Sequence, residues 1–363
     1  MTRTHVATSR EAGLSLVELL IAMTIGLLLL AGLTLIFVNS SEANRELQKT
    51  AQQIENGRYA IDVITQDLRH AGYYGHFHGT LPVPAALPDP CETADTAKLK
   101  EALAYPVQGY RAASLFAAAD VSATTCDTAL LTAANLKAGS DILVVRRANT
   151  TAISTAAASA VANEVYIQAT GTQLEVQVGS AAKVLNGKAS GGGSDWWINS
   201  GTPPTLPAPI RKLRTHVYFV APCSVGSGAG GVCQAGDDAI PTLKRLELGV
   251  GPAMTLVPLV EGIEYLKIEY GIDTWPGTVN PSTELVGDAT VDSFAAVPAA
   301  WEQVIAAKVY LLARNIEPTS GYTDDKTYTL GSVGVPAAND RIRRHAYSAS
   351  VRLMNASGRR EIP

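Results

Sequence analysis

The sequence predicts an α+β protein, in which one long N-terminal helix precedes a mainly antiparallel β-sheet domain with long loop insertions. An apolar run from Leu19 to Val38 continues into a polar segment without a helix breaker, since the first proline is Pro82. Short alternating or β-branched segments then recur between small-residue loops. The chain is 47% hydrophobic and only 17% charged, which is typical of an exported, loop-rich protein.

Length, charge and cysteine content narrow the class of protein. A chain of 363 residues holds one large domain or two ordinary ones. The formal net charge is −4 without a long basic run, so we expect no nucleic acid partner. Four cysteines without CxxC spacing predict two disulfides in an exported protein. Pairing Cys91 with Cys126 and Cys223 with Cys233 is the simplest of three connectivities, and the sequence leaves all three open.

The apolar run is long enough to cross a bilayer. A helix from Leu19 to Val38 covers about 30 Å. Basic residues precede it and balanced charges follow it, which places the N-terminus in the cytoplasm and the rest in the periplasm. A cleaved signal peptide, cut after Ser41-Glu42-Ala43, is an alternative, but its apolar core is usually only about 7–15 residues long. A plain signal anchor explains the length but not the carboxylate of Glu18.

The stretch GLSLVELL, which begins at Gly13, resembles the processing site of type IV prepilins and type II secretion pseudopilins. The resemblance implies that residues 1–13 are a leader, and that prepilin peptidase cuts after Gly13 and methylates the amine of Leu14. Leu14 stands where the family usually has Phe. Glu18, the fifth residue of the mature chain, is expected to pair with the amine of a neighbouring subunit. Such a pair offsets much of the cost of burying either charge in a filament core.

The helix is expected to extend over residues 14–70, with 14–38 in the membrane or filament core and 39–70 amphipathic. A turn signal follows at Ala71-Gly72, and residues 71–363 form the globular domain. Gly57 weakens the alternative of a free coiled coil. The apolar stripe predicted to pack under the globular domain consists of Leu47, Ala51, Ile54, Ile61, Ile64 and Leu68.

Residues 52–75, QQIENGRYAIDVITQDLRHAGYYG, resemble the matching helix of the PilW-type minor pilins of type IV pili. The segments VIAAKVYLLARN and RRHAYSASVRLMN resemble the two C-terminal strands of the same family. The resemblance covers residues 13–75 and 303–355 and is thin between them. It implies a pilin-like lollipop, with the long helix packed against the β-sheet domain. GspJ-type pseudopilins are related but usually have smaller globular domains.

The globular part contains eight strand candidates. Thr170-Gly171-Thr172 joins two of them as a hairpin. Clean alternation in Ile263–Tyr270 predicts a sheet with one wet face. Arg343-Arg344 is interpreted as a solvated strand start, and His216 and His345 as packing or surface residues. The candidates are Ile142–Arg147, Val165–Ala169, Leu174–Val178, His216–Val220, Leu243–Leu248, Ile263–Tyr270, Val304–Ala313 and Tyr347–Leu353.

Long Ala/Thr-rich or Gly/Pro-rich insertions lie at Pro82–Pro90, Thr150–Asn163 and Asn186–Pro209. We interpret them as tolerated surface variation, with a partner-binding surface as the alternative. The pair Trp196-Trp197 is either an anchor for a partner contact or a cap on the sheet's own core, and the sequence does not choose.

No catalytic or cofactor motif is present: a GxSxG elbow, a P-loop and HExxH are all missing. We therefore expect no enzyme activity, no cofactor and no metal. The histidines His70, His76 and His78 lack supporting carboxylates or thiols at ligand spacing. Calcium at Asp237-Asp238 or Asp324-Asp325 is left open, because neither pair has EF-hand spacing.

The resemblance implies a minor pilin that helps to prime type IV pilus assembly and sits in the pilus tip complex, supporting adhesion and twitching motility. The implied partners are prepilin peptidase, other minor pilins, the major pilin, a large tip adhesin and the inner-membrane assembly machinery. The chain would lie in the inner membrane before assembly and at the pilus tip afterwards. The alternatives are a GspJ-like pseudopilin of a type II secretion system and, from another class, a membrane-anchored periplasmic ligand-binding or hydrolytic domain.

Overall fold

The computed structural model describes residues 15–128, 130–153, 164–179, 208–249, 253–274 and 287–360. The predictions for Gly13, Leu14, Trp196 and Trp197 therefore lie outside the described residues. The chain divides into two compact units, Met1–Ala51 and Gln52–Pro363, and each is considered by itself. One long helix and antiparallel sheets confirm the predicted α+β class.

Helix α1 (Leu16–His70) runs without interruption for 55 residues. Its part in the first unit carries the apolar run, and the large apolar side chains from Leu16 to Val38 are all exposed. The helix is long and apolar enough to cross a membrane. It ends just before Gly72, whose φ of 73° lies in the left-handed region that glycine adopts without strain.

The second unit contains a seven-stranded antiparallel sheet, in which β1, β2, β5, β3 and β4 follow one another. Strand β5 is long enough to pair with β3 through its first residues and with β6 through its last, and β7 completes the sheet beside β6. The strands are β1 (Val107–Tyr110), β2 (Ile142–Ala148), β3 (Val165–Ala169), β4 (Leu174–Val178), β5 (Ile210–Ala221), β6 (Thr242–Leu248) and β7 (Met254–Glu261).

A four-stranded antiparallel sheet follows, in the order β13-β10-β8-β9. Its strands are β8 (Ile263–Ile272), β9 (Ser293–Ala295), β10 (Val304–Arg314) and β13 (Arg344–Arg352). A separate hairpin joins β11 (Tyr328–Leu330) to β12 (Val333–Val335). The short helices are α2 (Thr96–Ala102), α3 (Met354–Gly358) and the 3-10 turns η1 (Thr125–Thr128), η2 (Ala133–Asn135), η4 (Ala229–Gly231) and η5 (Trp301–Gln303).

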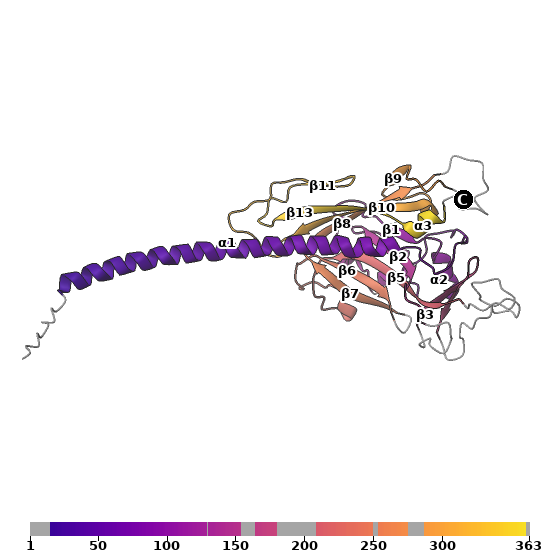
Figure 1. Ribbon diagram of the computed structural model, residues 1–363, viewed down its shortest axis with the longest axis horizontal. Helices are drawn as coiled ribbons and strands as arrows, with labels where there is room; N and C mark the ends of the chain where they lie inside the picture. Colours follow the sequence, from indigo (N-terminus) through magenta and orange to yellow (C-terminus); the bar gives the residue numbers. More distant parts are fainter. Residues whose placement is uncertain are drawn as a thin grey trace, which may run out of the picture. The chain divides into compact units, whose positions relative to one another are not determined.

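The C-terminal part of α1 forms the centre of the main core of this unit. Ala60, Ile64 and Leu68 are fully buried in one cluster with residues of both sheets, such as Tyr218 of β5 and Leu311 of β10. Figure 1 shows this part of the helix running alongside both sheets. Burying an apolar helix face against two sheets is the main stabilising contribution of such a layer.

The predicted helix stripe is wrong in part. Ile64 and Leu68 are buried, but Leu47 is 68% exposed and Ile54 is 40% exposed. The buried face instead includes the polar residues Gln53, Thr65 and Asp67, together with Gly57 and Ala60. These polar side chains are buried because β-strand groups far along the chain satisfy their hydrogen bonds.

The predicted wet face of β8 is also wrong. Lys267, a polar position in the alternating segment, is only 4% exposed. Its ammonium donates to Asp141 at 2.7 Å, so the charge is buried as a pair.

A small apolar cluster lies on β10 and the β11–β12 hairpin, where Leu312, Leu330 and Val335 are buried.

Both disulfides connect cysteines that are neighbours in the sequence, Cys91 with Cys126 and Cys223 with Cys233. All four residues belong to, or pack against, one apolar cluster that contains Val144, Val217 and Phe219. The disulfides therefore hold the loops of this unit onto the seven-stranded sheet.

Candidate functional site

The N-terminus of α1 carries a reciprocal capping arrangement. The backbone N–H of Ser15 donates to Glu18 Oε2 at 3.0 Å, and the N–H of Val17 donates to Ser15 Oγ at 3.4 Å. Ser and Glu three residues apart satisfy two of the N–H groups that a helix start leaves without partners. The sequence pattern of this capping box is Ser15-Leu16-Val17-Glu18, and it was not predicted above.

The capping arrangement uses one oxygen of Glu18. Within the described residues, Oε1 of Glu18 accepts no hydrogen bond, and the side chain lies at an exposed helix start. The other polar groups of the apolar run are satisfied inside the helix, because the hydroxyls of Thr24 and Thr34 donate to carbonyls of the preceding turn. Glu18 is thus the one carboxylate between Leu16 and Val38, and one of its two oxygens accepts no hydrogen bond from the described residues.

Three residues fasten the next part of α1 inside the second unit. The Gln53 amide donates to the carbonyls of Ala313 and Arg343, both at 3.0 Å. Asn56 donates to the carbonyl of Glu261 on the other sheet, also at 3.0 Å. A Cβ at Gly57 would lie 2.2 Å from the ring of Tyr347, so this glycine permits the close approach of β13. In the sequence, Gly57 only argued against a free coiled coil; in the structure, it makes room for the Tyr347 ring.

A buried charge network lies further along the helix, at Asp67. Its carboxylate accepts from Arg147 Nε at 2.6 Å, His216 Nδ1 at 2.6 Å and the Tyr218 hydroxyl at 2.9 Å. Burial alone would raise the pKa of Asp67, but hydrogen bonds and charge from His216, with the charge of Arg147, hold that pKa well below its usual range. His216, expected as a packing or surface residue, is instead buried and hydrogen-bonded to the helix.

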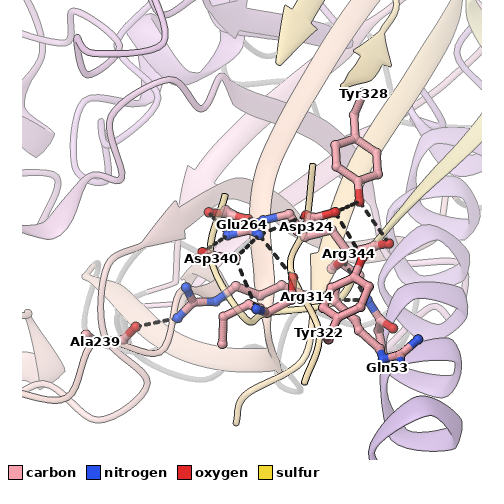
Figure 2. Close-up of polar contacts among 12 residues, drawn as sticks. Gln53, Ala239, Glu264, Arg314, Tyr322, Asp324, Tyr328, Asp340 and Arg344 are labelled. Atoms are coloured by element: carbon pink, nitrogen blue, oxygen red, sulfur yellow. Dashed lines mark hydrogen bonds and ion pairs between the residues drawn. The ribbon is translucent and has the colours of Figure 1, made fainter. Parts of the chain in front are cut away.

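A second charge network surrounds Arg344 (Figure 2). The guanidinium contacts Glu264 at 2.5 Å, Asp340 at 2.7 Å and Asp324 at 3.0 Å, and its side chain is 4% exposed. The expectation of a solvated strand start is therefore wrong for Arg344. Asp324 is fully buried and also accepts from the hydroxyl of Tyr328, so its oxygens are occupied within the fold. The network fastens the loop before β13 to β8.

The other candidate metal-binding residues make structural contacts within the fold. Asp89, Cys91 and Cys126 have ligand atoms within 4.8 Å of one another, but the two sulfurs are joined in a disulfide. The loop aspartates Asp237 and Asp238 accept backbone N–H groups of their own loop. In the described part of the chain, these groups therefore act as turn and loop acceptors.

Two family profiles match this chain. The profile described as the prokaryotic N-terminal methylation motif matches residues 8–34. The profile described as type IV pilus-assembly protein W, PilW, matches residues 217–355. The solved structures include a type IV-like pilin from Thermus thermophilus with 15% identity and a TM-score of 0.22, covering 54% of this chain and 85% of that one. That likeness is too low to carry an argument. No curated protein matches the chain.

An N-terminal methylation motif on an exposed apolar helix, followed by an antiparallel sheet unit, defines a type IV pilin-like protein, fitted for an anchor in the inner membrane. The second match narrows the class, because residues 217–355 match the PilW family model. The matched region takes in the end of β5 from residue 217 and every later described strand, including the part from 217 to 303 where the sequence resemblance was thin. The methylation motif implies processing by prepilin peptidase.

Proposed function

We propose that this protein is a minor pilin that helps to prime type IV pilus assembly and is then carried in the pilus tip complex. The observation that supports it best is Glu18, which lies on the exposed apolar part of helix α1 and whose Oε1 accepts no hydrogen bond from the described residues. The match of residues 217–355 to the PilW model supports the same role. In this proposal the leader comprises residues 1–13, and the amine made by cleavage after Gly13 belongs to Leu14.

The two environments of the helix explain the carboxylate. In the bilayer, the Ser15 N–H satisfies one oxygen of Glu18 near the membrane boundary. In a filament, the unused oxygen accepts a hydrogen bond from the methylated amine of Leu14 in a neighbouring subunit. The pair fixes the axial register of the two helices, while contacts between their apolar side chains supply most of the stability.

The remaining partners follow from this role. Other minor pilins and the major pilin would pack against the exposed apolar part of α1, and the inner-membrane machinery would extract the subunit. The globular unit would then support a large tip adhesin, surface attachment and twitching motility. No part of the role requires catalysis or a cofactor.

The test compares Glu18→Ala with Glu42→Gln, an exposed glutamate of the same helix beyond the apolar run. Glu18→Ala should still insert and be processed, as judged by membrane fractionation and the mature mass. It should fail to co-purify with other minor pilins and should not restore pili to a deletion strain. Glu42→Gln should co-purify with the other minor pilins and should restore pili. Normal incorporation of Glu18→Ala would contradict the proposal.

The deletion strain also separates the rival functions. Loss of pili with normal protein secretion is expected for a minor pilin. Loss of secretion with normal pili would identify a GspJ-like pseudopilin. Normal pili and normal secretion, together with ligand binding by the globular unit, would indicate a membrane-anchored periplasmic binding or hydrolytic domain.

A further inference from the structure

Lys244 is a buried cation that lies against the Cys223–Cys233 disulfide. Lys244 is 1% exposed, and its ammonium lies 3.6 Å from Cys233 Sγ and 3.8 Å from Cys223 Sγ. It also donates to the carbonyl of Gly231 at 3.4 Å. Among the described residues, no carboxylate lies within ion-pair distance of this ammonium, so the two sulfurs and the Gly231 carbonyl are the groups that face it.

The β5–β6 pairing sets this geometry. Lys244 of β6 is paired with Phe219 of β5, and Cys223 follows two residues after β5 ends. The backbone N–H of Cys233 donates to Asn135 Oδ1 at 3.0 Å, which holds the second cysteine in place. Between the cysteines, the loop is glycine-rich, and its residues from 224 to 231 are partly or fully exposed. The lysine is thus positioned by a sheet, while the chain that covers the sulfurs is a surface loop.

The two sulfurs are not equivalent. Cys233 Sγ accepts from the Cys223 backbone N–H at 3.2 Å in addition to facing the ammonium. Among the described residues, the Lys244 ammonium is the only donor to Cys223 Sγ, and it lies at the longer distance of 3.8 Å. A disulfide sulfur is a weak acceptor, whereas a thiolate is a strong one, so these donors favour a charged Cys233 once the bond is open.

Burial and the nearby carboxylates shift the pKa of Lys244 in opposite directions. Burial lowers the pKa of Lys244, and the more distant carboxylates of Asp238 and Asp237 raise it. Those carboxylates would also oppose a thiolate, but Asp238 is exposed and both accept backbone N–H groups. The buried ammonium lies 3.6 Å from Cys233 Sγ and is less screened by solvent than the exposed Asp238 carboxylate.

We propose that Lys244 and the Cys223 N–H lower the pKa of the Cys233 thiol whenever this disulfide is open, and that Cys233 is the thiolate that closes it. The oxidant is a protein or small molecule that carries a disulfide. After it forms a mixed disulfide with Cys223, the Cys233 thiolate attacks Cys223 Sγ. The new S–S bond forms as the bond to the oxidant breaks, and the oxidant leaves as a thiolate that takes up a proton. Over both steps, two cysteine thiols are oxidised and one oxidant disulfide is reduced to two thiols.

The test uses the full chain in detergent with Cys223→Ser, which leaves Cys233 as the single thiol because Cys91 and Cys126 remain bonded. Thiolate absorbance near 240 nm is followed against pH, with a thiol-free variant as the blank. The Cys233 pKa should lie below the ordinary value of about 8.5. Adding Lys244→Met should raise that pKa by about one unit or more.

Two comparisons make the result decisive. Lys308→Met makes the same change in the other sheet, where the ammonium lies over the ring of Phe294 at 3.6 Å, and should leave the thiol pKa unchanged. Cys233→Ser leaves Cys223 as the single thiol, which should titrate at a higher pH than Cys233 does. Equal titration of the two thiols, or a Cys233 pKa at or above about 8.5, would overturn the proposal even if Lys244→Met did not fold. An effect of Lys244→Met no larger than that of Lys308→Met would also overturn it.

Discussion

The buried carboxylate of Asp67 joins the helix to the seven-stranded sheet, and its removal should unfold the globular unit at a lower temperature. Asp67→Asn preserves the shape of the side chain but removes its charge. It also replaces one acceptor oxygen with an NH2 group that faces donors from Arg147, His216 and Tyr218. At least one of these donors then loses its acceptor in a site where Asp67 is 5% exposed.

The size of the effect follows from this burial. Breaking a buried ion pair by removing one partner costs about 3–5 kcal/mol. We expect the lower figure, about 3 kcal/mol, because one amide oxygen still accepts a hydrogen bond. Unfolding entropy is about 2.1 cal/mol/K per residue, so in the unit Gln52–Pro363 each kcal/mol lowers the Tm by about 1.5 °C, and the expected loss is about 4–5 °C.

The same carboxylate predicts a pH dependence. Its pKa is lowered in the folded chain, because the hydrogen bonds and charges from His216 and Arg147 outweigh the burial that would raise it. Such a group contributes its stability above the unfolded pKa of about 3.9 and loses it as the pH falls toward the lower folded value. The wild-type Tm should therefore fall more steeply below about pH 4 than the Tm of Asp67→Asn.

The assay is thermal unfolding of the detergent-solubilised chain, followed by near-UV circular dichroism between pH 7 and pH 2. Asp62→Asn is the matched control, since Asp62 lies on the same helix but is exposed and accepts from Gln66. It should change the Tm little at any pH. Equal Tm values for Asp67→Asn and the wild type at pH 7 would refute the reasoning.

Three further changes should also destabilise the globular unit. Gly57→Ala places a methyl group against the Tyr347 ring and should cost about 1–3 kcal/mol in denaturant unfolding, so an unchanged midpoint would contradict the packing role. Replacing Cys91 and Cys126 together by serine opens a loop with a separation of 35 residues and should cost about 4 kcal/mol of stability. The same change at Cys223 and Cys233, with a separation of 10 residues, should cost about 3 kcal/mol. A smaller loss for the first pair than for the second would contradict the dependence on loop length. Arg344→Met leaves three carboxylates facing one another and should lower the stability by about 3–5 kcal/mol, with protease resistance of the β13 region as a second measure; full resistance would contradict the account.

Strands with apolar alternation and clear turns were predictable from the sequence. Val165–Ala169 and Leu174–Val178 were predicted with the bounds that the structure has, because Thr170-Gly171-Thr172 marks the turn between them. The first half of β5 was missed, since its basic residues hide a strand whose Lys212 pairs with Glu164 at 2.7 Å. Strand β7 was missed as well, because Pro258 interrupts its pattern and prolines are tolerated on such edge strands.

The buried polar groups could not be predicted because their partners are distant in the sequence. Gln53 and Ala313 are 260 residues apart, and Asp67 and His216 are 149 residues apart. Local periodicity therefore placed Leu47 and Ile54 on the packing face and left out the polar residues that occupy it. By contrast, the motif around Glu18 is local, so its resemblance was available from the sequence, and the methylation profile matches there.

The central claim is that processing creates the amine with which Glu18 pairs. Mass analysis of the N-terminus of the membrane-extracted protein tests it most directly. The mature chain is expected to begin with N-methylated Leu14. A chain that begins at Asn44, or one that retains residues 1–13 in the assembled pilus, would contradict it.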